Sequence, residues 1–297
     1  MNNSRIIKTK KITNNRRKSK ERIWFLIFRF ATLLNGAALL LIVYFIISQG
    51  FKAISWEFLT KAPENSMTKG GILPCIVGTI SLCLITIMVA LPIGVASAIY
   101  LNEYAGKGKI VRIVRLGINN LAGVPSIVFG LFGLAFFCIV LKMGVSVAAG
   151  GLTLAIMTLP VIIGASEEAL KAVPDTYREA SIAMGASKWQ TIRKIVLPAA
   201  FPGIITGSIL GISRAAGETA PVMYTGAVFF TPVLPSSFFD EVMALPYHIY
   251  VLATAGTNIE ATRHLQYGTA LVLIALVFGM NLTAIILRSK MRKKLRI

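Results

Sequence analysis

Six apolar runs constrain the fold of this 297-residue chain more than any other feature, because each is long enough to cross a lipid bilayer. A membrane-spanning helix needs roughly 20 apolar residues, and a helix satisfies its own backbone hydrogen bonds in lipid. Charged residues make up 14% of the chain, well below the roughly 25% of a typical soluble protein. We therefore predict an all-α integral membrane protein. Six transmembrane helices are expected at 24–47, 72–101, 118–141, 145–166, 199–227 and 267–287.

The distribution of Lys and Arg predicts which side of the membrane each loop faces. If the N-terminus is cytoplasmic, 24 of the 31 basic residues fall in cytoplasmic segments and five in external ones. This asymmetry is typical of the positive-inside rule. It also accounts for the net charge of +19, so we expect contact with membrane lipid and no nucleic-acid partner. The basic tails 1–23 and 289–297 are then both cytoplasmic, and the first is expected to be unfolded against lipid.

Residues 167–198 form a polar segment between two apolar spans, with nine of the chain's 31 basic and 12 acidic residues. Residues 176–179 and 187–190 each match a capping box, in which a hydroxyl and a longer polar side chain satisfy the first amides of a helix. Gly185 suits the positive φ that follows a helix end, and Pro198 is expected to stop the second helix. The pattern predicts two short helices that meet at a glycine turn and dock on something outside the membrane.

Arg214 and Glu218 are two charged residues inside the fifth apolar run. Ionised side chains near the bilayer centre cost on the order of 3 kcal/mol each, and they persist where they face protein or water. Their i, i+4 spacing places them on one helix face. Two interpretations stay open: Arg214 contacts a transported anion while Glu218 balances its charge, or the two form a structural ion pair between subunits. Pro221 is expected to kink this helix.

Proline also interrupts other expected spans, at Pro74, Pro92, Pro125 and Pro160. Kinked helices are the ordinary interpretation of such prolines. At residues 123–126 the alternative is a break that exposes backbone to a transport path.

Sequence motifs for catalysis are absent: the chain has no Walker A, no H-E-x-x-H and no G-x-S-x-G motif. We therefore predict no catalytic residue, no metal site and no cofactor of its own. The three cysteines, Cys75, Cys83 and Cys138, all lie in expected spans, where they should be reduced and buried as small apolar side chains.

The polar segment 167–198 resembles the E-A-A-x3-G-x9-I-x-L-P loop of ABC importer permeases. In that family the loop forms coupling helices that fit a cleft on a separate ATPase, so the resemblance implies that ATP is bound by a partner subunit. Ser181 departs from the motif at its third position, where the family pattern has Ala. The residues that match, and that are expected to couple to the ATPase, are Glu179, Ala180, Gly185, Ile195, Leu197 and Pro198.

The resemblance extends over most of residues 70–288 and is strongest to the phosphate (Pst) branch of these permeases. Residues 98–104 and 121–128 look like that branch, and residues 214–221 are similar to the R-x-x-G-E-T-A-P run of its PstA-type subunits. The resemblance implies a type I (MetI-like) permease architecture of six transmembrane helices, with the first helix at 24–47 and the other five in a transmembrane domain at 70–288. The implied function is a permease subunit for inorganic phosphate uptake, with Arg214 and Glu218 on the substrate path.

The resemblance also implies partners in a bacterial plasma membrane. A second, PstC-like permease would complete the membrane path, and a dimeric PstB-like ATPase would dock at 167–198. A PstS-like external phosphate-binding protein would meet the long external loop 228–266. Two alternatives stay open: a permease of the same architecture for another oxyanion, such as molybdate or phosphonate, and an autonomous membrane transporter or enzyme.

Overall fold

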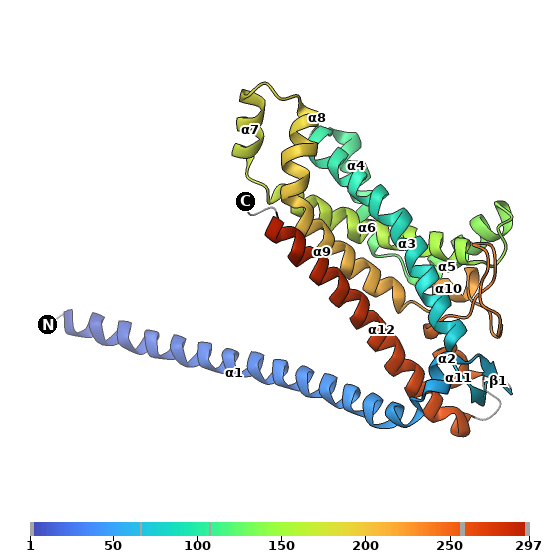
Figure 1. Ribbon diagram of the computed structural model, residues 1–297. Coiled ribbons are helices and arrows are strands. Elements are labelled where there is room, and N and C mark those ends of the chain that lie inside the picture. The colour runs from blue at the N-terminus through green and yellow to red at the C-terminus, as the bar shows by residue number, and fades with distance from the viewer. Residues whose placement is uncertain (1–2, 66, 107, 256–258, 295–297) are drawn as a thin grey trace.

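The computed structural model of the chain describes residues 3–65, 67–106, 108–255 and 259–294, and it is built almost entirely from helices (Figure 1). Five helices in these ranges are long and apolar enough to cross a membrane, and a sharply bent pair makes a sixth span if it is counted as one. The all-α membrane architecture is thus confirmed. The spans are Glu21–Ala53, Leu73–Tyr104, Val147–Lys171, Lys188–Ala216 and Thr262–Lys290, with Lys109–Ala122 plus Ser126–Val140 as the bent pair.

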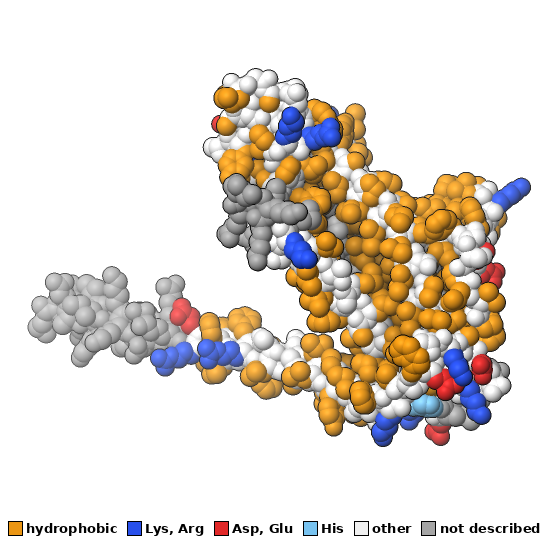
Figure 2. All heavy atoms as spheres, in the orientation of Figure 1, with side chains coloured by type: hydrophobic (Ala, Val, Ile, Leu, Met, Phe, Trp, Pro, Cys, Tyr) orange, Lys and Arg blue, Asp and Glu red, His pale blue; other side chains and the backbone are white. Residues whose placement is uncertain are grey.

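Apolar side chains cover most of the visible surface between the two ends of the helical body, and charged side chains gather toward those ends (Figure 2). An apolar belt between charged ends is the surface expected of a protein that is solvated by lipid. The visible face of the helical body is therefore suited to a bilayer.

Helix α1 (Asn3–Gly50) projects away from the other helices and meets the body near its C-terminal end, at α12 (Ile259–Lys294) (Figure 1). The two backbones are close at this junction, because a Cβ on Gly50 would lie 2.5 Å from the carbonyl oxygen of Tyr267. The backbone is helical from Asn3, so the expectation of an unfolded first tail was wrong. A helix that is already nucleated in the apolar run continues easily through Lys and Arg, which are good helix formers.

Three helices form the centre of the body: α3 (Leu73–Ile99), α6 (Val147–Lys171) and α9 (Leu197–Ala216). Glycines on α9 allow it to lie close to α6. A Cβ on Gly207 would lie 2.0 Å from the Cβ of Ala165, and one on Gly203 would lie 2.7 Å from the Cβ of Ala169. Small residues at four-residue spacing are a common means of close packing between membrane helices.

The third expected span is broken. A π-helical turn, η2 (Tyr100–Tyr104), follows α3, and α4 (Lys109–Ala122) then meets α5 (Ser126–Gly133) at an angle of 102°. A second π-helical segment, η3 (Leu134–Val140), completes the pair. Pro125 directly precedes α5 with an extended backbone, ψ 141°, which a residue with fixed φ and no N–H readily adopts before a helix. The break proposed for residues 123–126 is therefore present.

The fifth span differs from its expected bounds at both ends. Helices α8 (Lys188–Thr191), η4 (Ile192–Val196) and α9 run on as one 29-residue helix, so the expectation that Pro198 stops a helix was wrong. Pro198 lies in the first turn of α9, directly after the π-helical turn, a place where its missing N–H is tolerated. The span ends at Ala216 and resumes as α10 (Ala220–Thr225), so the chain breaks before Pro221 instead of kinking at it.

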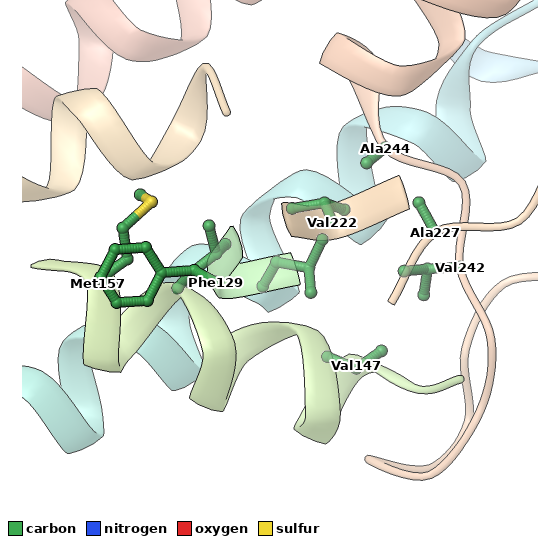
Figure 3. Close-up of a cluster of buried hydrophobic side chains, with 9 residues drawn as sticks. Phe129, Val147, Met157, Val222, Ala227, Val242 and Ala244 are labelled. Carbon is green, nitrogen blue, oxygen red and sulfur yellow. The ribbon is translucent and has the colours of Figure 1, made fainter. Parts of the chain in front are cut away.

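Short elements close the expected external side. They are η1 (Phe51–Ala53), α2 (Trp56–Thr60), the antiparallel pair β1 (Pro63–Glu64) and β2 (Lys69–Gly70), and α11 (Leu245–Thr254). An apolar cluster that includes Phe129, Met157 and Val222 joins α5, α6 and α10 (Figure 3). The same cluster contains Val242 and Ala244, so the long external loop is fixed to the membrane core.

Candidate coupling loop and transport path

Gly185 ends α7 (Asp175–Ala183), the first helix of the polar loop, in the conformation that its sequence predicts. Its φ is +84°, a region that side-chain-bearing residues rarely adopt. The Gly185 N–H donates to the carbonyl of Ile182 at 2.9 Å, and the Ala186 N–H donates to the carbonyl of Ser181 at 3.2 Å. These two bonds form a Schellman motif, which satisfies the last carbonyls of the helix.

The second capping box is present, and the first is not. The Ser187 hydroxyl accepts from the Gln190 N–H at 3.3 Å, and the Gln190 side chain accepts from the Ser187 N–H at 2.9 Å. At the first helix, Pro174 occupies the N-cap with no side-chain cap bond, so Thr176 lies inside the first turn. The rigid backbone of Pro174 starts the helix two residues before the position that a Thr176 cap requires. Glu179 is therefore left exposed.

Ser181 holds the two halves of the loop together. Its hydroxyl lies 2.9 Å from the hydroxyl of Thr191 on α8, and both side chains are buried. Thr191 also donates to the carbonyl of Ser187 at 3.1 Å. Ser181 is the position at which the family motif has Ala, so this chain has a polar link in a place where the motif alone would suggest only a small side chain.

Large apolar side chains stand out from the loop, although the surrounding sequence is polar. Met184 is 88% exposed, and Tyr177, Ile182 and Trp189 are each more than half exposed. Exposed apolar groups on a polar segment are typical of a protein-protein contact. These four residues define the docking face, and they were not among the residues that the sequence singled out.

The predicted coupling residues divide into two groups. Glu179, Ala180 and Gly185 are exposed on the loop beside the docking face. Ile195 in η4, and Leu197 and Pro198 at the start of α9, are half-buried. Leu197 packs against a buried cluster to which α3, α6, η4 and α9 all contribute. The first group can touch a partner directly, and the second joins the loop to the membrane helices.

Arg178 anchors α7 to two other segments. Its guanidinium forms a two-point ion pair with Glu103 in η2, at 2.8 Å and 3.3 Å. It also donates to the carbonyls of Leu170 and Val173, at 2.9 Å and 2.8 Å, and to the Asp175 carboxylate at 3.1 Å. The hydrogen bond with Glu103 raises the pKa of Arg178 further above its usual range. The two partners are 75 residues apart in sequence, and no local pattern predicts their contact.

A second ion-pair group joins α4 to α6. The buried Glu167 carboxylate pairs with Arg115 and, at 3.3 Å, with Lys171. Arg115 also donates to the carbonyl of Leu101 at 2.9 Å. The start of η2, the middle of α4 and the last turns of α6 are thus joined near the point where the polar loop emerges.

Arg214 and Glu218 form the expected ion pair, with Arg214 Nε 3.3 Å from Glu218 Oε1. The helix ends between them, however, so Glu218 lies just beyond α9 and not on the same helix face. The Arg214 side chain is 52% exposed, whereas that of Glu218 is 17% exposed. A cation at a helix C-terminus is stabilised by the helix dipole. The adjacent Ser213 is bonded to Asn281 of α12, which fixes this end of α9.

The two broken spans pack on one another. A Cβ on Gly130 of α5 would lie 3.0 Å from the Cα of Pro221 in α10. Non-helical backbone within an apolar span is tolerated where protein covers it or where it lines a water-filled cavity. The breaks at 123–125 and 217–219 therefore mark a region in which non-helical backbone lies within the apolar spans.

Broken apolar spans and an ordered polar loop with an apolar docking face define a membrane-embedded subunit of a transport complex. The model of the family described as "binding-protein-dependent transport system inner membrane component" matches residues 90–297, and the chain belongs to this family. It is accordingly a multi-pass inner-membrane component of a transport system and is not itself an enzyme.

Individual relatives agree with this assignment. The phosphate transport system permease protein PstA of Mycobacterium leprae is 37% identical over 90% of this chain and 88% of its own length. The probable ABC transporter permease protein YqgI of Bacillus subtilis is 31% identical over 90% of this chain and 95% of its own length. A chain of the inward-facing MetNI methionine ABC transporter shares the fold, with a TM-score of 0.57 and 20% identity over 74% of this chain and 94% of that one. The MetI-like permease fold is thus confirmed.

Proposed function

We propose that this chain is the PstA-type permease subunit of an ATP-driven importer and that it forms, with a second permease, the membrane path for inorganic phosphate. The observation that carries the proposal is the half-exposed Arg214 guanidinium at the break between α9 and α10, paired with Glu218. The name and 37% identity of the Mycobacterium leprae relative support phosphate as the cargo.

Arg214 suits this cargo because a guanidinium stays charged and presents a planar fork of N–H donors to a tetrahedral oxyanion. Glu218 neutralises the arginine in the empty state and yields to the anion during passage. A 3.3 Å pair with one exposed partner is a weak ion pair, so an incoming anion can displace the carboxylate. Weak and transient contact is what transport requires, because a tightly held anion would not be released.

The ATPase would dock on the loop that carries Met184 and Trp189, with the termini on the same, cytoplasmic side. The exposed side chains of Met184 and Trp189 lie on either side of the Gly185 turn. Such a protruding apolar surface can fill a cleft on a partner protein. ATP is bound by that PstB-like partner. The PstC-like permease and the PstS-like binding protein complete the complex.

The binding protein would meet the external loop 228–266. Phe229, Val233, Phe238 and Phe239 are all exposed on it, although Asp240 fixes the loop backbone through the N–H groups of Ser236 and Ser237 at 2.7 Å each. An ordered loop with exposed aromatic side chains is a suitable contact surface for a second protein.

Uptake of radiolabelled phosphate tests the proposal. The importer, purified with its ATPase and reconstituted in proteoliposomes that contain ATP, should take up phosphate when the binding protein is added outside. Excess molybdate or phosphonate should compete weakly. Stronger competition by one of these anions than by unlabelled phosphate would assign the importer to that anion. Uptake without any co-purifying ATPase would instead indicate an autonomous transporter.

A further inference from the structure

A cavity of about 720 Å³ opens where η2, α4 and the end of α6 meet. Four basic side chains contribute to its lining: Lys109, Arg112 and Arg115 from α4, and Lys171, the last residue of α6. The cavity lies apart from the Arg214 pair at the far end of α9, and neither the family match nor the proposed transport path assigns it a role. We propose that this basic pocket binds the phosphate group of an anionic ligand.

The charges in the pocket are only partly compensated. Arg115 and Lys171 share the single carboxylate of Glu167. Lys109 and Arg112 have no acidic partner among the described residues, and Glu103, the nearest carboxylate along η2, is taken by Arg178. Four basic side chains against one carboxylate leave a formal surplus of three positive charges. Such a surplus is stabilised by a multiply charged anion.

The backbone at the mouth of the pocket leaves room for a ligand. Gly106 and Gly108 line it, and neither would place a Cβ within 4 Å of another group. Gly108 is the N-cap of the 14-residue α4, with no side-chain cap and no acidic residue in the first turn. The first amides of α4 thus add partial positive charge to a pocket that its basic side chains already define.

The two faces of α4 place the pocket at a membrane surface. Ile110, Ile113 and Val114 are exposed on one face, while Arg112 and Arg115 line the pocket on the other. Because α4 is bent by 102° from the segment that follows it, this half of the bent pair can lie in the interface between lipid and water, with its apolar face toward the acyl chains. The pocket is then within reach of two sources of a phosphate group: the headgroup of an anionic lipid, or a free phosphate ion on the same side.

The ligand would bridge α4 and the end of α6, which the Glu167 ion pairs already join in part. A phosphate group held by Lys109 and Arg112 would also meet Lys171, the residue that leads from α6 into the polar loop. The bound anion would therefore add to the Glu167 ion pairs and stabilise the contact between α4 and the start of the coupling loop.

Binding to the intact detergent-purified importer tests the proposal. Native mass spectrometry with phosphatidylglycerol and phosphatidylcholine probes the headgroup, and isothermal titration calorimetry with inorganic phosphate probes the free ion. Lys109→Gln with Arg112→Gln should weaken binding by about 30-fold, because each basic residue near an anionic headgroup contributes about 1 kcal/mol and about 1.4 kcal/mol is tenfold. These two residues are exposed and have no ion-pair partner in the part of the chain that the structure describes, so the variant should fold, as its thermal unfolding would verify.

Arg288→Gln with Lys290→Gln, near the end of α12, removes the same charge and should leave binding unchanged. Loss of phosphatidylglycerol binding only in the first variant assigns a lipid headgroup, and loss of phosphate binding only in that variant assigns the free ion. Either result supports the pocket. Equal weakening in both variants, anion binding that the Lys109 and Arg112 changes leave at wild-type strength, or no binding of either anionic probe overturns it.

Discussion

Arg178 and Glu103 join the coupling loop to the end of the second span through two N–H···O contacts, at 2.8 Å and 3.3 Å. Both side chains are mostly buried, 17% and 7% exposed. Because the same guanidinium also holds the carbonyls of Leu170 and Val173, α7 cannot shift without moving η2 or the end of α6. We infer that the pair passes movement of the loop into the membrane helices.

Arg178→Lys should uncouple transport from ATP hydrolysis, because lysine keeps the charge but loses the planar guanidinium that makes all of these contacts. We expect the ratio of phosphate transported to ATP hydrolysed to fall several-fold in proteoliposomes. Arg193→Lys, at an exposed position of η4, is the matched control and should keep the ratio. A normal ratio in Arg178→Lys would show that the fork is not needed for coupling.

Gly185→Val should reduce transport without preventing membrane insertion. A β-branched residue at φ +84° is strained by roughly 1–2 kcal/mol or more, so the turn should rearrange and the docking face should lose its shape. Co-purification of the ATPase measures the effect directly. Gly279→Val serves as the control, because Gly279 lies in α12 with nothing within 4 Å of an added Cβ. Wild-type recovery of the ATPase with Gly185→Val would contradict the prediction.

Substitutions at Arg214 and Glu218 separate a substrate contact from a structural pair. Arg214→Gln should abolish phosphate uptake, Arg214→Lys should lower it because the fork is lost, and Glu218→Gln should be milder because a neutral acceptor remains. Initial uptake rates at equal expression give the comparison. Near-normal uptake by the double variant Arg214→Gln with Glu218→Gln would exclude direct contact between Arg214 and the anion.

His248 should make the stability of the protein sensitive to acid. Burial in α11 lowers its pKa to about 4, whereas an unfolded histidine titrates near pH 6.5, so each pH unit of acidification between about 6.5 and 4 removes up to about 1.4 kcal/mol of stability. The stability that depends on neutral His248 is thus fully present above about pH 6.5 and is lost as the pH falls toward 4. His248→Leu should flatten the fall of the unfolding temperature across this range, and His264→Leu, at an exposed site, should not. Parallel pH profiles for wild type and His248→Leu would refute the assignment.

The orientation of the chain can be measured with single cysteines. In a variant that lacks Cys75, Cys83 and Cys138, an impermeant thiol reagent should label a cysteine at Ser237 in intact cells. Cysteines at Ser19 and Ser289 should react only after permeabilisation, because the basic residues hold both ends in the cytoplasm. Labelling of either terminal position in intact cells would reverse the topology.

Much of the architecture follows from the sequence, because long apolar runs determine the spans regardless of their partners. The glycine turn at Gly185 was predictable for a related reason: a positive φ is a local requirement. The errors at Thr176 and Pro198 arose where neighbouring backbone, Pro174 in one case and a π-helical turn in the other, changed which residue begins or continues a helix.

The ion pairs could not be predicted, because they join segments that are distant in sequence. Arg115 and Glu167 are 52 residues apart, and only the packing of α4 beside α6 brings them together. The docking face was missed for a different reason. Met184 and Trp189 are isolated apolar residues in a polar segment, and their exposure depends on how α7 turns back toward α8.

The helix that continues through Pro198 has a mechanical consequence. Trp189 on the docking face and Arg214 beside the break lie on one continuous helix, which includes the π-helical turn η4. The 25 residue steps from Trp189 to Arg214 span about 38 Å at α-helical rise. A tilt of about 5° at the Trp189 end would displace the Arg214 guanidinium by about 3 Å, roughly the length of one hydrogen bond. If the proposed ATPase docks at that end, a small rotation there would be enough to make or release the proposed contact between Arg214 and the anion.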